Sequence, residues 1–333
     1  MVNTFENEQY CKKTISKLAV GMLVGAVVIQ VAAIAITAVM YSFSSLSLKD
    51  SNSEIILSAI CVYCVGLPVA YLILKDMRHV HPLKNRVTVG QFFKLFAVSY
   101  ALAYVSNVFG TVIISILSAI KGAPIENNVF DKVMGSDIIT EVIFMVILAP
   151  IVEELVFRKL LIDRTLIFGD RAAIFISALA FGLFHGNFGQ FIYAFTLGMV
   201  FGYVYIRTGN ILITMGLHGL MNFLGSAVAS SLLKMIDIEK FMDIYAGGDI
   251  NEILRFFGEN ATGMLIFSVY GMLIFAILIT GIIVFFLNFR HLTLYEGEIT
   301  IPRERFFKTT VLNVGMMLFI AYFIVLIILQ IVK

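Results

Sequence analysis

The sequence predicts an all-α fold, a polytopic bundle of about eight to nine transmembrane helices. Hydrophobic residues make up 60% of the 333 and charged residues only 14%, and the mean hydropathy of +0.96 lies far above that of a soluble domain. The apolar residues form long runs, and a helix of about 20 residues crosses a hydrocarbon core about 30 Å thick. Lys and Arg gather in alternate loops between these runs. Together these observations indicate a multi-pass membrane protein.

Nine apolar runs are candidate helices, and we expect them at residues 18–43, 55–74, 92–120, 138–161, 172–186, 188–206, 211–233, 261–289 and 310–332. Three regions follow from this order. Residues 1–136 hold N-terminal transmembrane helices, 137–233 a helical core with polar side chains, and 234–333 a long loop followed by C-terminal transmembrane helices.

Charge predicts the orientation, because Lys and Arg in short loops tend to stay in the cytosol. With the N-terminus inside, 17 of the 24 Lys and Arg residues fall on the cytosolic side and 7 on the other. We therefore expect a cytoplasmic membrane protein with a cytosolic N-terminus, whose first helix is a retained anchor behind a polar leader at 1–17. The net charge of +2 and the lack of a basic, aromatic-interleaved surface give no indication of nucleic acid binding.

The composition of several loops predicts what these loops contact. The basic loop 75–94 is expected to touch anionic headgroups, and the external loop 234–260 to hold an interfacial amphipathic helix that could cover a site. A β-like patch at 293–301 is either a partner contact or, in our interpretation, a plain linker. Pairs of glycines four apart, at 182 and 186 and at 198 and 202, predict close packing of the fifth and sixth helices.

Ionisable side chains inside apolar runs are costly and indicate function. In the fourth run Glu153 and Glu154 are adjacent, and Glu154 precedes Arg158 by four residues, the favourable order for a helical ion pair. Glu153 points about 100° away around the helix, so that one carboxylate can be neutralised while the other stays available. Alternatively, both acids extend to the cytosolic interface beside Arg158 and Lys159.

Two further runs contribute complementary polar groups. His185 ends the fifth run, where a lone histidine is by itself more often a hydrogen-bonded core residue than a catalyst. His218 and Asn222 lie four apart in the seventh, on one helix face. Such a pair can donate two hydrogen bonds to one oxygen, or can join helices. A carboxylate with a histidine can activate water, and donors on a third helix can stabilise an oxyanion, so the combination suffices for peptide hydrolysis.

Other intramembrane protease chemistries fit the sequence poorly, because it contains neither an HExxH zinc helix nor a GxSxG nucleophile elbow. The order EExxxR, FxxxH and HxxxN instead resembles the CPBP family of intramembrane proteases, also described as type II CAAX prenyl endopeptidases, Abi proteins or bacteriocin-processing enzymes. The similarity covers about residues 137–230 and includes Ala149-Pro150 before the glutamates, SALAFG at 177–182 and YIRTGN at 205–210.

The resemblance implies an intramembrane endopeptidase that cleaves a membrane-associated or hydrophobic peptide. Glu153 would act with His185 to activate water, and His218 with Asn222 would form the oxyanion site. Glu154 and Arg158 would support this geometry. Lys159 departs from the glycine that follows the arginine in bacterial relatives, which puts local packing or a substrate contact in question. For a bacterial chain, leader-peptide removal, pheromone maturation or self-immunity to a bacteriocin are natural tasks.

Some alternatives stay open on the sequence. Relatives are often called metalloproteases, and Glu153, His185 and His218 could hold zinc with one position free for water; we favour no metal and no cofactor. A non-catalytic membrane scaffold or bacteriocin immunity protein is the main alternative function, and a transporter a third. The expected partners are the lipid bilayer and a peptide or membrane-protein substrate, reached through a cavity that opens to the cytosol. The oligomeric state is left open.

Overall fold

A computed structural model describes residues 4–42, 50–125 and 128–332, and in these ranges the chain is helical with no strand. The first half contains α1 (Thr4–Ser42), α2 (Ser51–Ala59), η1 (Ile60–Gly66), α3 (Leu67–Leu74), α4 (Val89–Lys121), α5 (Asn128–Gly135), α6 (Ile138–Thr140), η2 (Glu141–Leu148), α7 (Ala149–Glu154), η3 (Leu155–Ile162), α8 (Asp163–Thr165) and η4 (Leu166–Phe168). The second half contains α9 (Asp170–Phe184), α10 (Phe188–Thr208), α11 (Ile211–Asn222), η5 (Phe223–Val228), α12 (Ala229–Met235), α13 (Ile238–Gly247), α14 (Ile250–Glu259), α15 (Ala261–Asn288), η6 (Phe289–His291), η7 (Arg303–Arg305), α16 (Phe306–Thr310) and α17 (Val314–Val332). The predicted all-α class is thus confirmed.

Seven helices in the described ranges are long and apolar enough to cross a membrane, and they match seven of the nine predicted runs. The other two runs, 138–161 and 172–186, do not reach that standard. The first belongs to the continuous helical stretch α6 to α8, which carries several charged side chains. The second is α9, which has only 15 residues and so a length of about 22 Å at about 1.5 Å per residue. These two elements carry the glutamates and His185.

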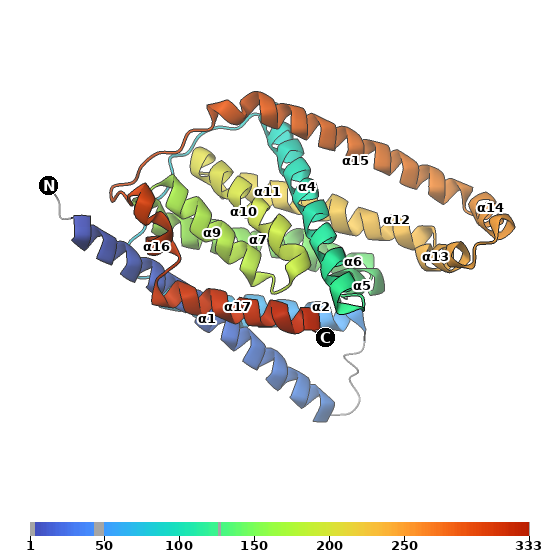
Figure 1. Cartoon of the computed structure of the whole chain (residues 1–333), viewed down its shortest axis with the longest axis horizontal. Helices are drawn as coiled ribbons and strands as arrows, with labels where there is room; N and C mark the ends of the chain where they lie inside the picture. Colours follow the sequence, from blue (N-terminus) through green and yellow to red (C-terminus); the bar gives the residue numbers. More distant parts are fainter. Residues whose placement is uncertain (1–3, 43–49, 126–127, 333) are drawn as a thin grey trace.

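The helices form a bundle that encloses the segments carrying the glutamates and His185 (Figure 1). Helices α1 and α17 pack together along one side, and α4 and α15 along another. Between them lie α7, α9, α10 and α11 (Figure 1). The largest buried cluster gathers side chains from α1, α3, η3, α9, α10 and α17. The apolar outer helices therefore surround the central ones that hold the candidate site.

A tight hairpin joins α9 to α10. A Cβ atom added at Gly198 would come within 2.6 Å of the Ala178 Cα, so only glycine permits this close approach of the two helices. A Cβ atom added at Gly182 would come within 3.1 Å of the Phe191 carbonyl oxygen. The predicted packing role of Gly186 is wrong, because this residue turns the chain between the helices at φ +66°, a conformation that suits glycine.

Loops from distant parts of the sequence meet at the end of the bundle that carries most of the basic side chains. The Val80 N–H donates to the Asp163 carbonyl (2.6 Å) and the Asn85 N–H to the Thr208 carbonyl (2.8 Å). His81 Nδ1 lies 2.5 Å from the Asp163 carboxylate. Loop 75–88 thus docks on the protein itself, beyond any contact that it makes with headgroups.

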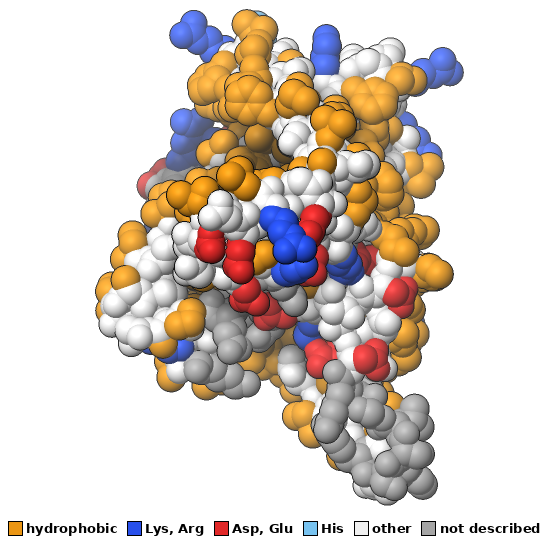
Figure 2. Space-filling model, turned by 90° about the vertical axis from the view of Figure 1, so that its right-hand side faces the viewer, with side chains coloured by type: hydrophobic (Ala, Val, Ile, Leu, Met, Phe, Trp, Pro, Cys, Tyr) orange, Lys and Arg blue, Asp and Glu red, His pale blue; other side chains and the backbone are white. Residues whose placement is uncertain are grey.

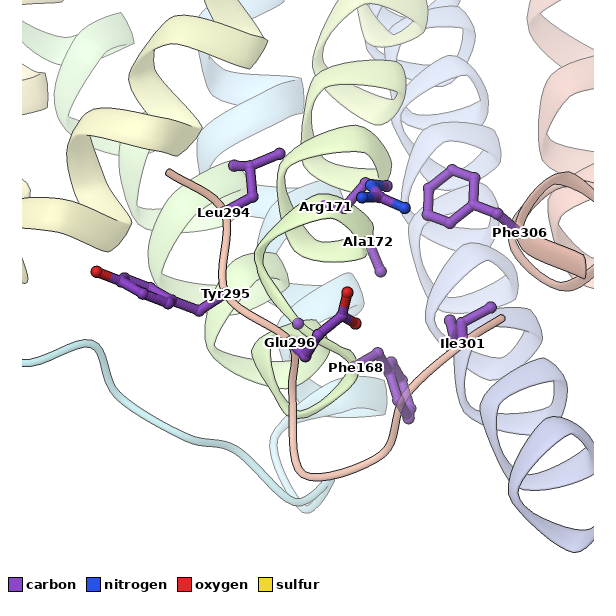
Figure 3. Close-up of a pocket in the computed structure, with 9 residues that line it drawn as sticks. Phe168, Arg171, Ala172, Leu294, Tyr295, Glu296, Ile301 and Phe306 are labelled. Carbon is purple, nitrogen blue, oxygen red and sulfur yellow. The ribbon is translucent and has the colours of Figure 1, made fainter. Parts of the chain in front are cut away.

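Residues 292–302 form a strap across the start of α9 (Figure 3). The Ile299 N–H donates to the Ile167 carbonyl and the Asp170 N–H to the Tyr295 carbonyl, each at 3.0 Å. A Cβ atom on Gly297 would come within 2.2 Å of the Ile167 oxygen, so the strap approaches as closely as glycine allows. The extended patch predicted at 293–301 is therefore a contact within this chain, and the interpretation as a plain linker is wrong.

Ion pairs between buried and partly buried side chains stabilise the opposite end of the bundle. Figure 2 views the molecule from this end and shows acidic and basic side chains gathered near the centre of the face. Glu141 is fully buried and accepts from Lys234 Nζ at 2.9 Å and from Ser230 Oγ at 2.7 Å. Asp137 starts the helix that leads to the glutamates. Its carboxylate accepts from the Thr140 N–H at 2.8 Å, and this bond holds the pKa of the Asp137 carboxyl below its usual range.

Candidate active site

A proline shapes the helix that carries the two glutamates. Pro150 has no N–H, so the carbonyl five residues before it, that of Met145 in the wide turns of η2, loses its helical partner. Asn222 supplies the missing donor, because its Nδ2 lies 2.8 Å from the Met145 oxygen. Gly219 lets α11 approach, since a Cβ atom there would lie 3.1 Å from the Val146 oxygen. The Ala-Pro pair before the glutamates thus creates the docking point for α11.

Three charged or titratable side chains form a buried cluster at this contact. Glu154 and Arg158 are fully buried and pair across one helical turn, with Oε2 and Nε 3.0 Å apart. His218 Nδ1 lies 3.1 Å from the other carboxylate oxygen, Oε1. The helical spacing predicted the first contact, whereas the second depends on the docking of α11. Glu154 is therefore held by two cationic or donor groups and faces no free space.

Aromatic rings enclose Arg158. Its guanidinium carbon lies 4.7 Å from the centroid of Phe181 and 5.5 Å from that of Phe201. Its nitrogens have no directed hydrogen bond within the described chain, so ring faces and the Glu154 charge stabilise this buried cation. The alternative that both acids extend to the interface is wrong for Glu154, because its side chain and that of Arg158 are shielded from solvent.

Glu153 turns the other way, as its position on the helix predicted. Its side chain is 24% exposed, and its Oε2 lies 3.8 Å from His218 Nε2, too far for a direct hydrogen bond but close enough for one water to contact both. His218 thus lies between the two carboxylates, one nitrogen toward each. Glu153 is the carboxylate of the pair that reaches open space.

His185 caps the end of α9 and faces the same space. Its Nδ1 lies 2.8 Å from the Phe181 carbonyl oxygen. The Phe181 ring stands between the histidines, with its centroid 5.0 Å from that of His185 and 5.8 Å from that of His218. Phe181 therefore fixes the spacing of the histidines that the sequence placed in separate helices.

These contacts assign the protons of both imidazoles. A carbonyl and a carboxylate oxygen accept hydrogen bonds, so the proton of each neutral ring belongs on Nδ1, in His185 toward Phe181 and in His218 toward Glu154. Each Nε2 is then an acceptor. His218 can donate from Nε2 only when protonated, and Asn222 has one of its two amide protons engaged by Met145.

A cavity of about 1120 Å³ brings the parts together, and it is lined by Glu153, His185, His218 and Asn222 together with residues of α2, α4, α5, α10 and α15. Glu54 of α2 and Lys132 of α5, whose charged groups lie 3.0 Å apart, are among the lining residues. The basic-end loops contribute no described residue to it. We therefore place its mouth at the α5 end.

This direction disagrees with the expected opening to the cytosol. On the predicted orientation the α5 end is external, so a cytosolic N-terminus and a cytosolic mouth cannot both hold. The possibility that loop 234–260 covers the site also gains no support, because none of its described residues lines the cavity. Its helices α13 and α14 exist as predicted, but the cavity is lined by α5 and not by them.

The donors do not fit a zinc site. A tetrahedral centre needs three protein ligands on one point, and no group of three His, Cys, Asp or Glu side chains in the described residues is placed to hold a metal ion. We derive no step through a metal.

Sequence reasoning missed three residues that shape this site. Phe181 and Phe201 enclose Arg158, and the buried Thr214 hydroxyl contacts Glu154. Phe181 opens the FxxxH pattern, and Thr214 precedes His218 by one turn of α11. Phe201 has no comparable signal, because apolar aromatic side chains are common throughout the chain.

Comparison with known protein families places a match on the segment that carries the site. Residues 135–224 match the family described as "Type II CAAX prenyl endopeptidase Rce1-like", and this segment contains all six predicted site residues. No curated protein and no solved structure matches the chain.

Proposed function

We propose that this chain, which carries a domain of the type II CAAX prenyl endopeptidase Rce1-like family at residues 135–224, is an intramembrane endopeptidase whose water is activated by Glu153. One observation carries the proposal. Of the two adjacent carboxylates, Glu154 is neutralised by Arg158 and His218, whereas Glu153 faces a cavity inside an apolar bundle. A free carboxylate beside an acceptor nitrogen, here Nε2 of His185, is the arrangement that general-base hydrolysis needs.

The groups take distinct roles in this mechanism. Glu153 removes a proton from a water that His185 Nε2 helps to orient, and the water oxygen attacks the carbonyl carbon of the scissile peptide. Arg158 and Glu154 hold His218, and a protonated His218 together with the second amide proton of Asn222 stabilises the developing oxyanion. When the C–N bond breaks, the proton on Glu153 passes to the leaving amine.

The cavity suggests the class of substrate. Its volume of about 1120 Å³ exceeds that of an ordinary small-molecule site. Aromatic and aliphatic side chains of α15, among them Phe267, Ile274 and Leu278, form one wall, and polar residues of α10 another. Such a space suits a hydrophobic or membrane-associated peptide, whose backbone seeks polar partners while its side chains pack on the apolar wall.

The Glu153→Gln substitution tests the proposal because it keeps the shape of the side chain and removes the base. We expect it to abolish peptide cleavage. The measurement is mass spectrometry of membrane proteins and secreted peptides from cells that express either form at matched levels. Glu252→Gln, on the exposed face of α14, is the matched control and should cleave as the native chain does.

New peptide termini that appear with the native chain and the control, but not with Glu153→Gln, support the proposal and identify the substrate. Cleavage that persists in Glu153→Gln contradicts it. Equal peptide patterns in all three strains, with a phenotype that still requires the protein, favour the membrane scaffold or immunity protein instead.

A further inference from the structure

A second polar network lies in the cavity wall directly after His185. Asn187 caps the start of α10, and its Oδ1 accepts the backbone N–H of Gln190 at 2.8 Å. Asn187 Nδ2 then donates to Gln190 Oε1 at 2.5 Å, and Gln190 Nε2 donates to the Tyr193 hydroxyl at 2.9 Å. All three side chains line the cavity together with His185 and Glu153.

This network has a fixed direction. The backbone N–H can only donate, so Asn187 must present its oxygen to it and its amide nitrogen to Gln190. Gln190 must then present its oxygen to Asn187 and its nitrogen to Tyr193. The Tyr193 oxygen is therefore an acceptor toward Gln190, and its own proton has no acceptor among the described residues.

The free phenol proton lies on the wall of the same cavity and would add a third donor to the two of the proposed mechanism. His218 Nε2 donates only when the ring is protonated, and Asn222 has one amide proton engaged by Met145. Tyr193 lines the cavity from α10, and Glu153 lines it from α7. A peptide carbonyl attacked by a water on Glu153 would occupy the space between them.

We propose that Tyr193 is a further catalytic residue, which donates a hydrogen bond to the carbonyl oxygen of the scissile peptide, and that Gln190 is its positioning residue. The inference rests on the proposed function. In the balanced step, Glu153 takes a proton from water, the water oxygen bonds to the carbonyl carbon, and the electron pair of the C=O bond moves to the oxygen. Tyr193 keeps its proton and stabilises this oxyanion. Collapse then breaks the C–N bond, and Glu153 protonates the amine.

The test uses the full chain purified into liposomes and a library of proteome-derived peptides, with new termini read by mass spectrometry. The best-cleaved peptide is then synthesised with a fluorophore and a quencher to measure kcat and KM. We expect Tyr193→Phe to lower kcat about 100-fold with KM nearly unchanged, because the ring still packs and only the oxyanion contact is lost. Tyr322→Phe, which removes a hydroxyl from α17 outside the cavity, should retain native values.

A second variant keeps Tyr193 but directs its phenol proton to the side chain at position 190 and away from the substrate carbonyl. In Gln190→Glu the introduced carboxylate accepts from the phenol, so kcat should again fall with KM nearly unchanged. As the pH is lowered and that carboxyl is protonated, kcat should recover relative to that of the native chain at the same pH. A purely structural role of Gln190 predicts no such recovery.

The outcomes separate the inference from the function on which it rests. If Glu153→Gln is inactive while Tyr193→Phe keeps its kcat, or changes only KM, the role of Tyr193 is overturned and the proposed function stands. If the native chain cleaves no peptide in the library, both are overturned.

Discussion

At the scale of the residue, the two adjacent glutamates differ because their neighbours differ. Glu154 meets Arg158 on its own helix and His218 on α11, and it is fully buried. Glu153, one position earlier and about 100° around the helix, meets the cavity. A buried charge is tolerated only when it is paired, so Glu154 takes the structural position and Glu153 is the carboxylate that faces the cavity.

Arg158→Lys tests this assignment, because lysine keeps the charge and loses the planar group. The guanidinium lies against Phe181 and Phe201 while it reaches Glu154, and an ammonium cannot do both. We expect the substitution to reduce the free energy of unfolding, measured by titration with SDS, by about 2 kcal/mol. Arg255→Lys on α14, where both partners of the ion pair are exposed, should leave it unchanged; equal stabilities of the two variants would contradict the role of the rings.

The helical spacing predicted the pairing of Glu154 with Arg158 and the divergence of Glu153. It could not predict the rings around Arg158, because Phe201 lies 43 positions further on and resembles many other apolar residues. Nor could it predict that His218 would approach Glu154, since this contact depends on how α11 docks. Local geometry can be derived from the sequence, whereas contacts between helices depend on packing.

At the scale of the element, the helix that carries the glutamates departs from regular α-helical hydrogen bonding, and this departure lets another helix bond to it. Wide helical turns lie on both sides of α7, and Pro150 leaves the Met145 carbonyl open to a donor from α11. Asn222 therefore joins two helices with one amide proton and can offer the other to the cavity. The prediction of a catalytic Asn222 and the alternative that it joins helices are compatible.

A double-mutant cycle tests this junction. Asn222→Leu leaves the partly buried Met145 carbonyl without a donor from the protein, and we expect it to reduce the free energy of unfolding by about 1–3 kcal/mol. In a Pro150→Ala background the restored backbone N–H can satisfy that carbonyl within the helix, so the same substitution should cost less. The measurement is unfolding of all four proteins in SDS, and additive losses would show that the proline and the asparagine act independently.

At the scale of the whole molecule, the two ends of the bundle differ in how they are closed. At the basic end, the loop 75–88 bonds to Asp163 and Thr208, and the strap 292–302 bonds to Ile167 and Asp170. At the other end, Glu141 with Lys234 and Glu54 with Lys132 hold α5 and its neighbours beside the cavity mouth. The loops seal one end, and charged pairs flank the opening at the other.

Cysteine labelling tests which end faces the cytosol. In a variant with alanine at the three native cysteine positions, Leu83→Cys marks the basic end and Tyr245→Cys the end of α13, since both native side chains are exposed. The Lys and Arg count predicts that a membrane-impermeant maleimide labels Tyr245→Cys in intact cells and Leu83→Cys only after the membrane is opened. The reverse pattern would invert the orientation and give the cavity the cytosolic mouth that we first expected.

The sequence by itself determined the membrane class, the positions of the seven apolar helices and the identity of the polar residues in three of the central helical segments. These features depend on composition, run length and helical spacing, which are local properties of the chain. The tertiary structure decided which carboxylate is buried, that the strap 292–302 binds its own chain, where the cavity opens, and that Tyr193 faces it. Each of these depends on contacts between segments far apart in sequence, and such contacts are set by the packing of side chains around glycines and the proline-opened helix.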